Sequence, residues 1–134
     1  MIQSDISILR ARFFTQFDPN DAQVLWIGKK AQNVNESIPY CRLVIEPGTC
    51  ELVEKGETRT HLQLGLISLF ITIPKGVGLG QGYTLRDKFS ALFRDWVSDD
   101  RALVIGGSTD LPIRETDTHI VLGLRFRWES FRSS

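Results

Sequence analysis

The sequence predicts an α+β domain, in which helices pack on a mainly antiparallel sheet. Two segments repeat apolar residues at helical spacing, one near the amino terminus and one after residue 83. Other segments alternate apolar and polar residues or form short apolar runs, as strands do. The expected order is one helix, four strands, a second helix and two strands. We expect residues 1–134 to form a single domain, since this length can bury one core.

The composition is ordinary for a soluble globular protein, with 42% hydrophobic and 24% charged residues. The 16 basic and 16 acidic side chains cancel, so only a local patch could bind nucleic acid electrostatically. No apolar run approaches the roughly 20 residues of a membrane span. The first residues lack the basic-then-apolar order of a signal peptide, which predicts a protein made and kept in a cytoplasm.

The first helix is expected from about Asp5 to Phe17, with Ser4 as its N-cap and Asp5 at its positive end. Its apolar stripe consists of Ile6, Leu9, Phe13 and Phe17. A short strand over Val24–Gly28 and a polar loop over Lys29–Ser37 are expected to follow.

A strand from Tyr40 to Glu46 is expected to end in a turn at Pro47 and Gly48. The segment beyond, residues 47–60, is rich in charge, and we expect it to project as a mobile arm that assembly orders. A turn at this place sets Cys41 and Cys50 out of register for a disulfide, so both thiols are expected to be free.

The longest strand is expected over His61–Ile73. Beyond Gly65 both of its faces become apolar, which predicts a central strand covered on both sides. The glycine itself marks a bulge or a place of close packing.

The second helix is expected to begin at Thr84, which forms with Asp87 a start that resembles a capping box. A short strand (102–105), a loop (106–117) and a closing strand (118–129) follow. The helix carries an apolar stripe of Leu85, Phe89, Leu92, Phe93 and Trp96, and the closing strand points Ile120, Leu122, Leu124, Phe126 and Trp128 to one face.

Four glycines at alternate positions, Gly76 to Gly82, precede the second helix as in a phosphate-binding loop. The P-loop motif is absent, because the lysine at position 75 comes before the glycines and Tyr83 follows them. The dinucleotide motif fails as well, because Gln81 stands where the last glycine is required. We therefore interpret the loop as a connection, with no cofactor.

No catalytic constellation is evident in the sequence, so we expect a protein that is not an enzyme. Asp117 and His119, near Asp110 and Glu115, could form a metal site, but a third ligand is not apparent and solvated edge residues are the simpler interpretation. No zinc-ligand spacing occurs.

The candidate interaction residues lie in two places. Arg125 and Arg127 share the strand face opposite the predicted core, where they could be solvated, meet a partner or line a lumen. Trp26 and Trp128 are interpreted as core residues rather than interface anchors. The arm contributes Glu51, Glu54, Lys55, Glu57 and Arg59, with Glu46 at its root.

The order of these motifs resembles the tail-terminator and tail-completion proteins of long-tailed bacteriophages, including the minor tail protein that ends a lambda-type tail. The resemblance covers about Ile6 to Trp128, and it rests on PYCRLVIEPG, GLISLFITIPKGVG, KFSALFRDW and HIVLGLRFRW. This chain departs in its longer glycine run and in the polar segment around Asn33 and Asn35, so contacts there do not transfer.

The resemblance implies a structural virion protein that assembles in the host cytoplasm into a hexameric ring at the head-proximal end of the tail. Its partners would be copies of itself, the tail tube protein and the head–tail connector, with DNA passing through the lumen and no membrane contact. A head–tail adaptor, another small binding module, or a small enzyme using the glycine loop or Asp117 and His119 are the alternatives.

Overall fold

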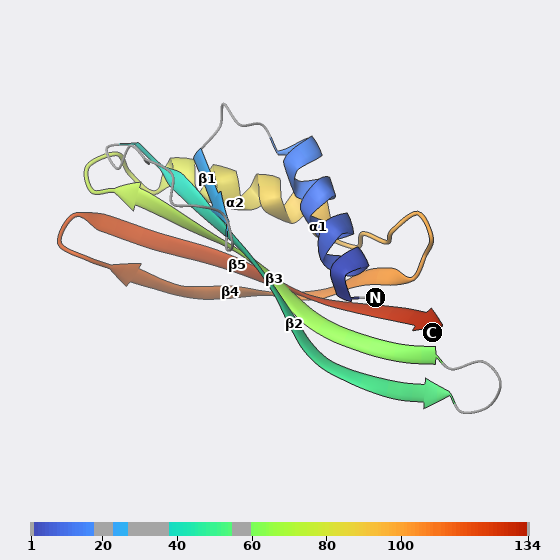
Figure 1. Cartoon of the computed structure of the whole chain (residues 1–134). Helices are drawn as coiled ribbons and strands as arrows, with labels where there is room; N and C mark the ends of the chain where they lie inside the picture. The colour runs from blue at the N-terminus through green and yellow to red at the C-terminus, as the bar shows by residue number, and fades with distance from the viewer. Residues whose placement is uncertain (1, 18–22, 27–37, 55–59, 134) are drawn as a thin grey trace.

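A computed structural model describes residues 2–17, 23–26, 38–54 and 60–133 of the chain. These residues form an α+β fold, as predicted, with two helices and a five-stranded sheet (Figure 1). The elements in chain order are α1 (Ile2–Gln16), β1 (Gln23–Trp26), β2 (Tyr40–Glu54), β3 (Thr60–Pro74), α2 (Gly80–Phe93), β4 (Leu103–Glu115) and β5 (His119–Ser133). Only one strand, not two, therefore lies between β1 and β3 in the described part of the chain.

The sheet has the order β1-β2-β3-β5-β4, and all neighbouring strands are antiparallel except β1, which runs parallel to β2. The central position of β3 confirms the prediction for this long strand. Both helices lie on the same side of the sheet (Figure 1), so the expectation that β3 is covered on both sides is wrong. The apolar residues on its second face, such as Phe70, are only half-buried.

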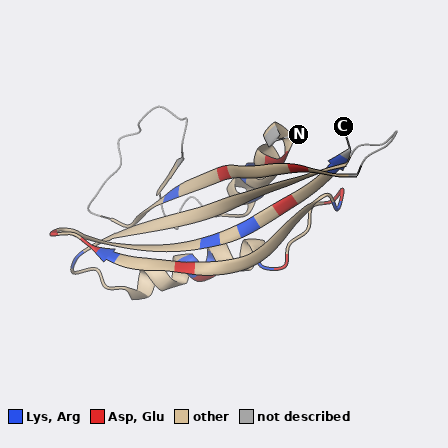
Figure 2. Cartoon of the chain, turned by 90° about the horizontal axis from the view of Figure 1, so that it is seen from below, with Lys and Arg blue, Asp and Glu red and all other residues tan. Residues whose placement is uncertain are grey.

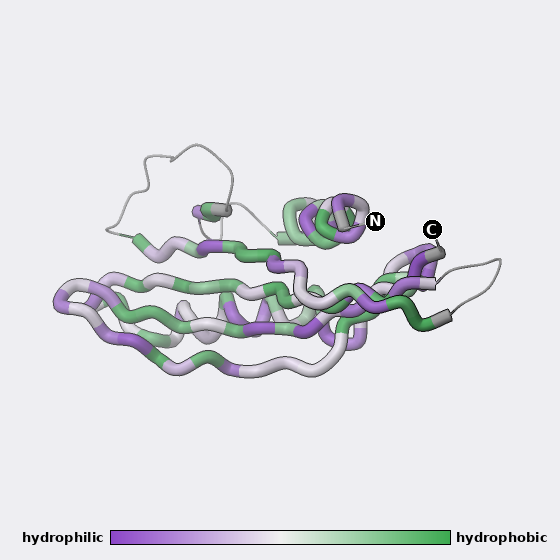
Figure 3. The backbone as a smooth tube through the Cα atoms, turned by 60° about the horizontal axis from the view of Figure 1, so that its bottom comes forward, coloured by the Kyte–Doolittle hydropathy of each residue, from purple (hydrophilic) through white to green (hydrophobic). Residues whose placement is uncertain are grey.

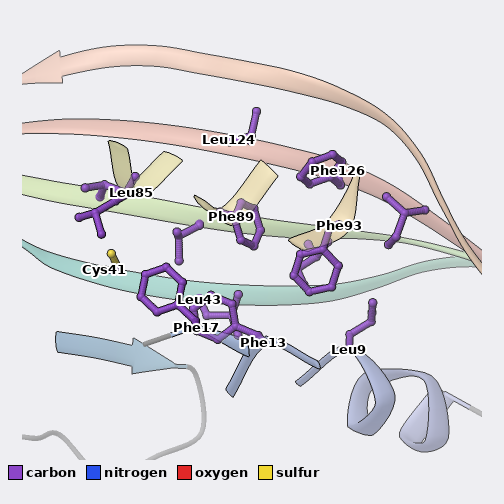
Figure 4. Packing of buried hydrophobic residues seen from close by; sticks show 14 of the residues in the cluster. Leu9, Phe13, Phe17, Cys41, Leu43, Leu85, Phe89, Phe93, Leu124 and Phe126 are labelled. Carbon is purple, nitrogen blue, oxygen red and sulfur yellow. The ribbon is translucent and has the colours of Figure 1, made fainter. Parts of the chain in front are cut away.

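The core lies between the helices and one face of the sheet (Figure 4). Each element contributes the face that its periodicity predicts: α1 buries Leu9 and Phe13, and α2 buries Phe89 and Phe93. These side chains meet the odd-numbered residues of β3 and the even-numbered residues of β5. The fully or nearly buried strand residues include Cys41, Leu43, Ile67, Leu69, Ile71, Ile73, Leu122, Leu124, Phe126 and Trp128.

An arginine also joins the two helices. The Arg12 Nε atom of α1 donates a hydrogen bond of 2.7 Å to the carbonyl oxygen of Leu92, in the last turn of α2. Its guanidinium group lies 4.7 Å from the ring centre of Trp96. A cation at this position satisfies a carbonyl that the helix end leaves without an intrahelical partner. Burial lowers the pKa of Arg12.

Strand β2 continues through Pro47 and Gly48, where a turn was expected. Residues 48 and 49 together lie opposite Leu64, so the extra residue forms a bulge and the strand remains paired with β3 as far as residue 54. Proline and glycine are typical of turns, but both also occur in bulges and edge strands. The arm is therefore, in its described part, the outer half of a β-hairpin that extends past both helices (Figure 1).

Strand β4 is also longer than predicted, because most of the expected loop over residues 106–117 is strand. Two bulges interrupt its pairing with β5, one at Gly106 and Gly107 and one at Pro112 and Ile113. Each bulge shifts the alternation of side chains by one residue, so a search for regular alternation fails here.

Both helices begin earlier than their capping signals suggested. Helix α1 starts at Ile2, so Ser4 lies inside its first turn and is not the N-cap. Helix α2 starts at Gly80, and the hydroxyl of Thr84 donates to the carbonyl of Gly80. Gly82 is buried, and a Cβ there would lie 2.6 Å from the Leu122 Cδ1 atom, so two of the loop glycines belong to a helix packed closely on the sheet.

Both cysteines are free, as predicted, although the expected turn that led to this prediction is absent. They lie on the same strand, where Cys41 faces Ile71 and Cys50 faces Gln63. We expect a thiol reagent at pH 8 to modify Cys50 rapidly in the native protein, because its side chain is exposed. Cys41 should react only on unfolding, because burial raises its pKa to about 12. A Cys50→Ser variant should show no rapid reaction, and rapid modification of that variant would contradict the buried position of Cys41.

Within the described residues, neither helix has the length and apolar character that would be needed to cross a lipid bilayer. The predicted loop over Lys29–Ser37 and the end of the first predicted strand, Ile27 and Gly28, lie outside the described residues.

Candidate interaction surface

One face of the sheet carries no helix, and Figure 2 shows it from below. We define the open face as the side chains of residues 40–46, 66–72, 109–114 and 121–129 that point away from the helices. Paired residues on neighbouring strands point to the same side, so Arg125 shares this face with Ser68 and Thr109. Leu66 and Arg127, also paired with each other, lie farther along the same face. The prediction that the two arginines lie opposite the core face is confirmed.

The arginines of the open face form no ion pair with the carboxylates that the structure describes. Arg125 is half-buried, and its Nε atom donates a hydrogen bond of 3.0 Å to the buried hydroxyl of Ser68. Arg127 is exposed. Among the described residues, no ion pair joins a carboxylate to these two side chains or to Arg42 and Arg114, which lie on the same face. The open face therefore exposes positive charge that the described part of the protein does not neutralise by pairing.

Two hollows lie along β5 on this face. The first, of about 420 Å³, is bounded by Leu64, Leu66, Arg127 and Glu129 and by the bulges of β2 and β4. The second, of about 300 Å³, is lined by apolar side chains and two arginines, among them Phe70, Leu111, Pro112, Val121, Arg114 and Arg125. Leu111 packs directly over Gly123, whose missing side chain leaves room for it. Positive charge and apolar surface thus occur side by side.

The sheet edges are poorly suited to further strand pairing. Strand β1 pairs with only the first four residues of β2, and β4 forms the opposite edge. Pro47 lies in the part of β2 beyond β1, and Pro112 lies in β4. Bulges interrupt this outer part of β2 and strand β4. Proline and bulges are the features by which edge strands resist the addition of another strand, so contact through the open face is favoured over strand addition.

The arm exposes apolar and acidic side chains together. Glu51 is exposed, and so are Leu52 (43%), Val53 (45%) and Phe131 (46%), the last on the adjacent end of β5. Figure 3 shows hydrophobic residues, coloured green, at this end of the sheet. Among the other arm residues singled out from the sequence, the side chain of Glu54 is not among those described, and Lys55, Glu57 and Arg59 lie outside the described residues.

The glycine loop forms a tight turn between β3 and α2. Gly76 and Gly78 have φ angles of 95° and 92°, which other residues rarely adopt, so these glycines are required by the backbone. Lys75 forms an ion pair of 3.1 Å with Glu115 across the sheet end. The loop thus has a structural explanation that does not involve a phosphate.

The four residues considered as metal ligands in the sequence do not come together in the structure. Asp110 forms an ion pair with Arg86 at 3.3 Å, and the carboxylate of Glu115 is paired as described above. Asp117 lies in the turn before β5 rather than on a strand, and the His119 Nδ1 atom is 2.8 Å from the hydroxyl of Thr118. Among the described residues, no group of three His, Cys, Asp or Glu side chains is placed to hold a metal.

The structure contains a buried ion pair that the sequence did not predict. Asp5 of α1 is fully buried and accepts hydrogen bonds from the Ser130 hydroxyl at 2.6 Å and the Arg132 Nε atom at 2.7 Å. Arg132 also bonds Asp100 at 2.9 Å. Hydrogen bonds from Ser98, then from the Ala102 N–H and then from Arg132 lower the pKa of Asp100 to about 2. The partners of Asp5 are more than 120 residues away, so no local pattern reveals them.

Comparisons with known proteins establish the fold and nothing more. No family model and no curated protein matches the chain. Among solved structures 21 chains match. One of them, a protein whose name describes no function, has 15% sequence identity and a TM-score of 0.63, over 92% of this chain and 94% of that chain. At this identity the likeness shows a shared fold alone.

Proposed function

We propose that the chain is a structural protein of a long-tailed bacteriophage that forms a hexameric ring at the head-proximal end of the tail tube. In this role it stops polymerisation of the tube protein and offers a surface to the head–tail connector. The proposal assigns the chain no catalytic residue, cofactor or metal. Its place is in the virion, after assembly in the host cytoplasm.

The observation that carries this proposal is the open face together with the arm. A ring subunit needs two different surfaces that neighbouring copies can join, because a head-to-tail contact that closes on itself generates a ring. The open face offers hollows and arginines that form no ion pair with the described carboxylates, and the arm offers exposed apolar side chains at the far end of the same sheet. The sequence motifs that resemble tail terminators lie in β2, β3, α2 and β5, which build this sheet and its helical layer.

The proposal is tested by deleting the gene from the genome that carries it and imaging the particles by electron microscopy. We expect tails longer than normal and separated from heads, because nothing would stop the tube or join it to the connector. The wild-type gene supplied on a plasmid should restore normal length and attachment.

Two outcomes would count against the proposal. Tails of normal length attached to heads would remove any role in tail completion. Tails of normal length that stay separate from heads would instead support the adaptor alternative, in which the chain joins the two parts without controlling length.

A further inference from the structure

We infer that the outer part of the open face is a docking site for a second copy of this chain, and that the two copies pack face to face about a two-fold axis. This contact goes beyond the proposed function and does not rest on it. A copy whose open face is covered in this way cannot offer that face to a ring neighbour. The dimer is therefore a form of the chain before assembly.

The first argument is an apolar patch on the side of the sheet that neither helix covers. The open face continues beyond residue 66, because the pairing of β3 with β5 is regular along both strands. Leu62, Leu64 and Leu66 alternate along β3 on this side, and Phe131 is paired with Leu62. We call these four residues the leucine patch. Leu64 (37%) and Phe131 (46%) are exposed, and the other two are half-buried. Contiguous exposed apolar residues of this kind are typical of contact sites.

The second argument is a pair of opposite charges beside the patch. Arg127 is paired with Leu66 and Glu129 with Leu64, so the two charged side chains lie on the same face, two residues apart on β5. Arg127 is exposed and Glu129 is half-buried, and neither forms an ion pair with the side chains that the structure describes. Neighbouring charges of opposite sign make a face complementary to a copy of itself that is turned by half a rotation.

One two-fold axis satisfies both features. It lies between the two sheets, runs across the strands and passes midway between residues 127 and 129. Arg127 of each copy then lies opposite the partner's Glu129. On the adjacent strand Leu64 lies opposite the partner's Leu66, because these residues belong to the same two rows of the sheet. The contact is isologous, so each of these pairs occurs twice in the dimer.

The packing and the size of this contact are those of two stacked sheets. Such sheets keep their strands within about 30° of each other, and their facing side chains interdigitate. The side chains nearest the axis border the first hollow, so those of the partner enter it. At the border of the contact Arg125 lies near the partner's Phe131, where a guanidinium group and an aromatic ring attract each other.

The area of the contact predicts its strength. Strands β2, β3, β5 and β4 are spaced by about 4.8 Å and four rows of side chains by about 6.8 Å, which gives roughly 500 Å² for each copy. A standard interface takes about 800 Å² from each partner. We therefore expect a dimer with a micromolar rather than a nanomolar Kd.

Nucleic acid fits this part of the open face less well than a second copy does. Phosphate contacts need cationic and hydrogen-bonding groups. Here Glu46, Glu51 and Glu129 are each paired with one of the three leucines, and Arg127 lies among them. Three carboxylates beside a single arginine would repel a phosphate backbone, and the leucines would find no apolar partner on it.

The test is an exchange of the two charges. Arg127→Glu alone would set two carboxylates against each other at both symmetric contacts, and Glu129→Arg alone would do the same with two guanidinium groups. Each variant should weaken dimerisation, measured by sedimentation equilibrium, at least about tenfold. The double variant, Arg127→Glu with Glu129→Arg, restores both contacts with their signs exchanged and should dimerise about as well as wild type. A contact between this face and a different surface would not be restored in this way.

Matched variants serve as controls. Arg94→Glu makes the same change of charge at an exposed residue that follows α2, and it should dimerise like wild type. Leu64→Lys should weaken the dimer, whereas Val77→Lys, at an exposed apolar residue in the turn before α2, should not. The variants should remain folded by circular dichroism, because these side chains are exposed. If Glu129→Arg does not fold, the comparisons of Arg127→Glu with Arg94→Glu and of the two lysine variants carry the test.

Several results would overturn the inference. A wild-type chain that stays monomeric at its highest soluble concentration would remove the dimer, while the test of tail length in the proposed function would be unaffected. Dimers that Arg127→Glu and Leu64→Lys leave intact would place the interface elsewhere. Larger oligomers that these variants weaken, and that the charge exchange does not restore, would make the contact head-to-tail and would support the proposed ring. If Arg127→Glu keeps the dimer but no longer binds double-stranded DNA that wild type binds, the face serves nucleic acid instead.

Discussion

Replacing Arg132 by alanine is expected to lower the free energy of unfolding by about 3–5 kcal/mol, although this residue is close to the carboxyl end of the chain. The reason is the carboxylate of Asp5, which is fully buried and would lose its only charged partner among the described residues. The hydroxyl of Ser130 would remain as a hydrogen-bond donor, but it carries no charge. Urea denaturation of the two proteins at pH 7 gives the difference directly.

Matched variants separate the buried pair from the exposed one. Asp100→Asn removes the charge of the second partner of Arg132 but keeps a side-chain oxygen that can accept from Ser98 and from the Ala102 N–H. The Asp100 side chain is 49% exposed, so a loss of about 1 kcal/mol or less is expected. Adding Asp5→Asn to Arg132→Ala should recover part of the loss, because the unpaired charge is then gone. A loss below about 1 kcal/mol for Arg132→Ala itself would mean that Asp5 finds another partner or water.

The fold class and the core were predictable because they depend on local periodicity. The buried faces of α1, α2, β3 and β5 agree with the spacing of Leu9, Phe13, Phe89 and Phe126 along the chain. The predictions of turns and loops failed. Proline and glycine in β2 and β4 indicated a turn and a loop, whereas the structure uses them in bulges at the edges of the sheet. A bulge is stabilised by its neighbouring strand, which a reading of local sequence does not include.

The candidate surface was predictable in part for the same reason. Alternation along β5 was enough to place Arg125 and Arg127 opposite the core. The hollows were not predictable, because they depend on bulges and on the contact of Leu111 with Gly123 across two strands. The link from Asp5 to Arg132 was also hidden, because it joins the two ends of the chain through tertiary packing.

Gly65→Ala is expected to destabilise the protein by about 1–3 kcal/mol or more, the range for overpacking a core. A Cβ at this position would overlap the indole ring of Trp128 and would lie 2.7 Å from the carbonyl oxygen of Glu46. The Trp128 side chain is almost fully buried, and the carbonyl belongs to the neighbouring strand, so neither can move without disturbing the packing between helices and sheet. Thermal unfolding followed by circular dichroism should show the loss as a lower Tm.

The same methyl group added elsewhere should have the opposite effect. Gly80 begins α2 with an ordinary φ, and a Cβ added there would have no neighbouring atom within 4 Å. Gly80→Ala should therefore be neutral or stabilise the helix by a few tenths of a kcal/mol, up to about 1 kcal/mol. Because the two variants differ from wild type by the same chemical change, the comparison isolates the contact with Trp128. A smaller side chain opposite the glycine should then relieve the strain, so Trp128→Phe combined with Gly65→Ala should cost less than the sum of the two single changes. Equal stability of the Gly65→Ala and Gly80→Ala proteins would show that the indole ring does not pack against the backbone of β3.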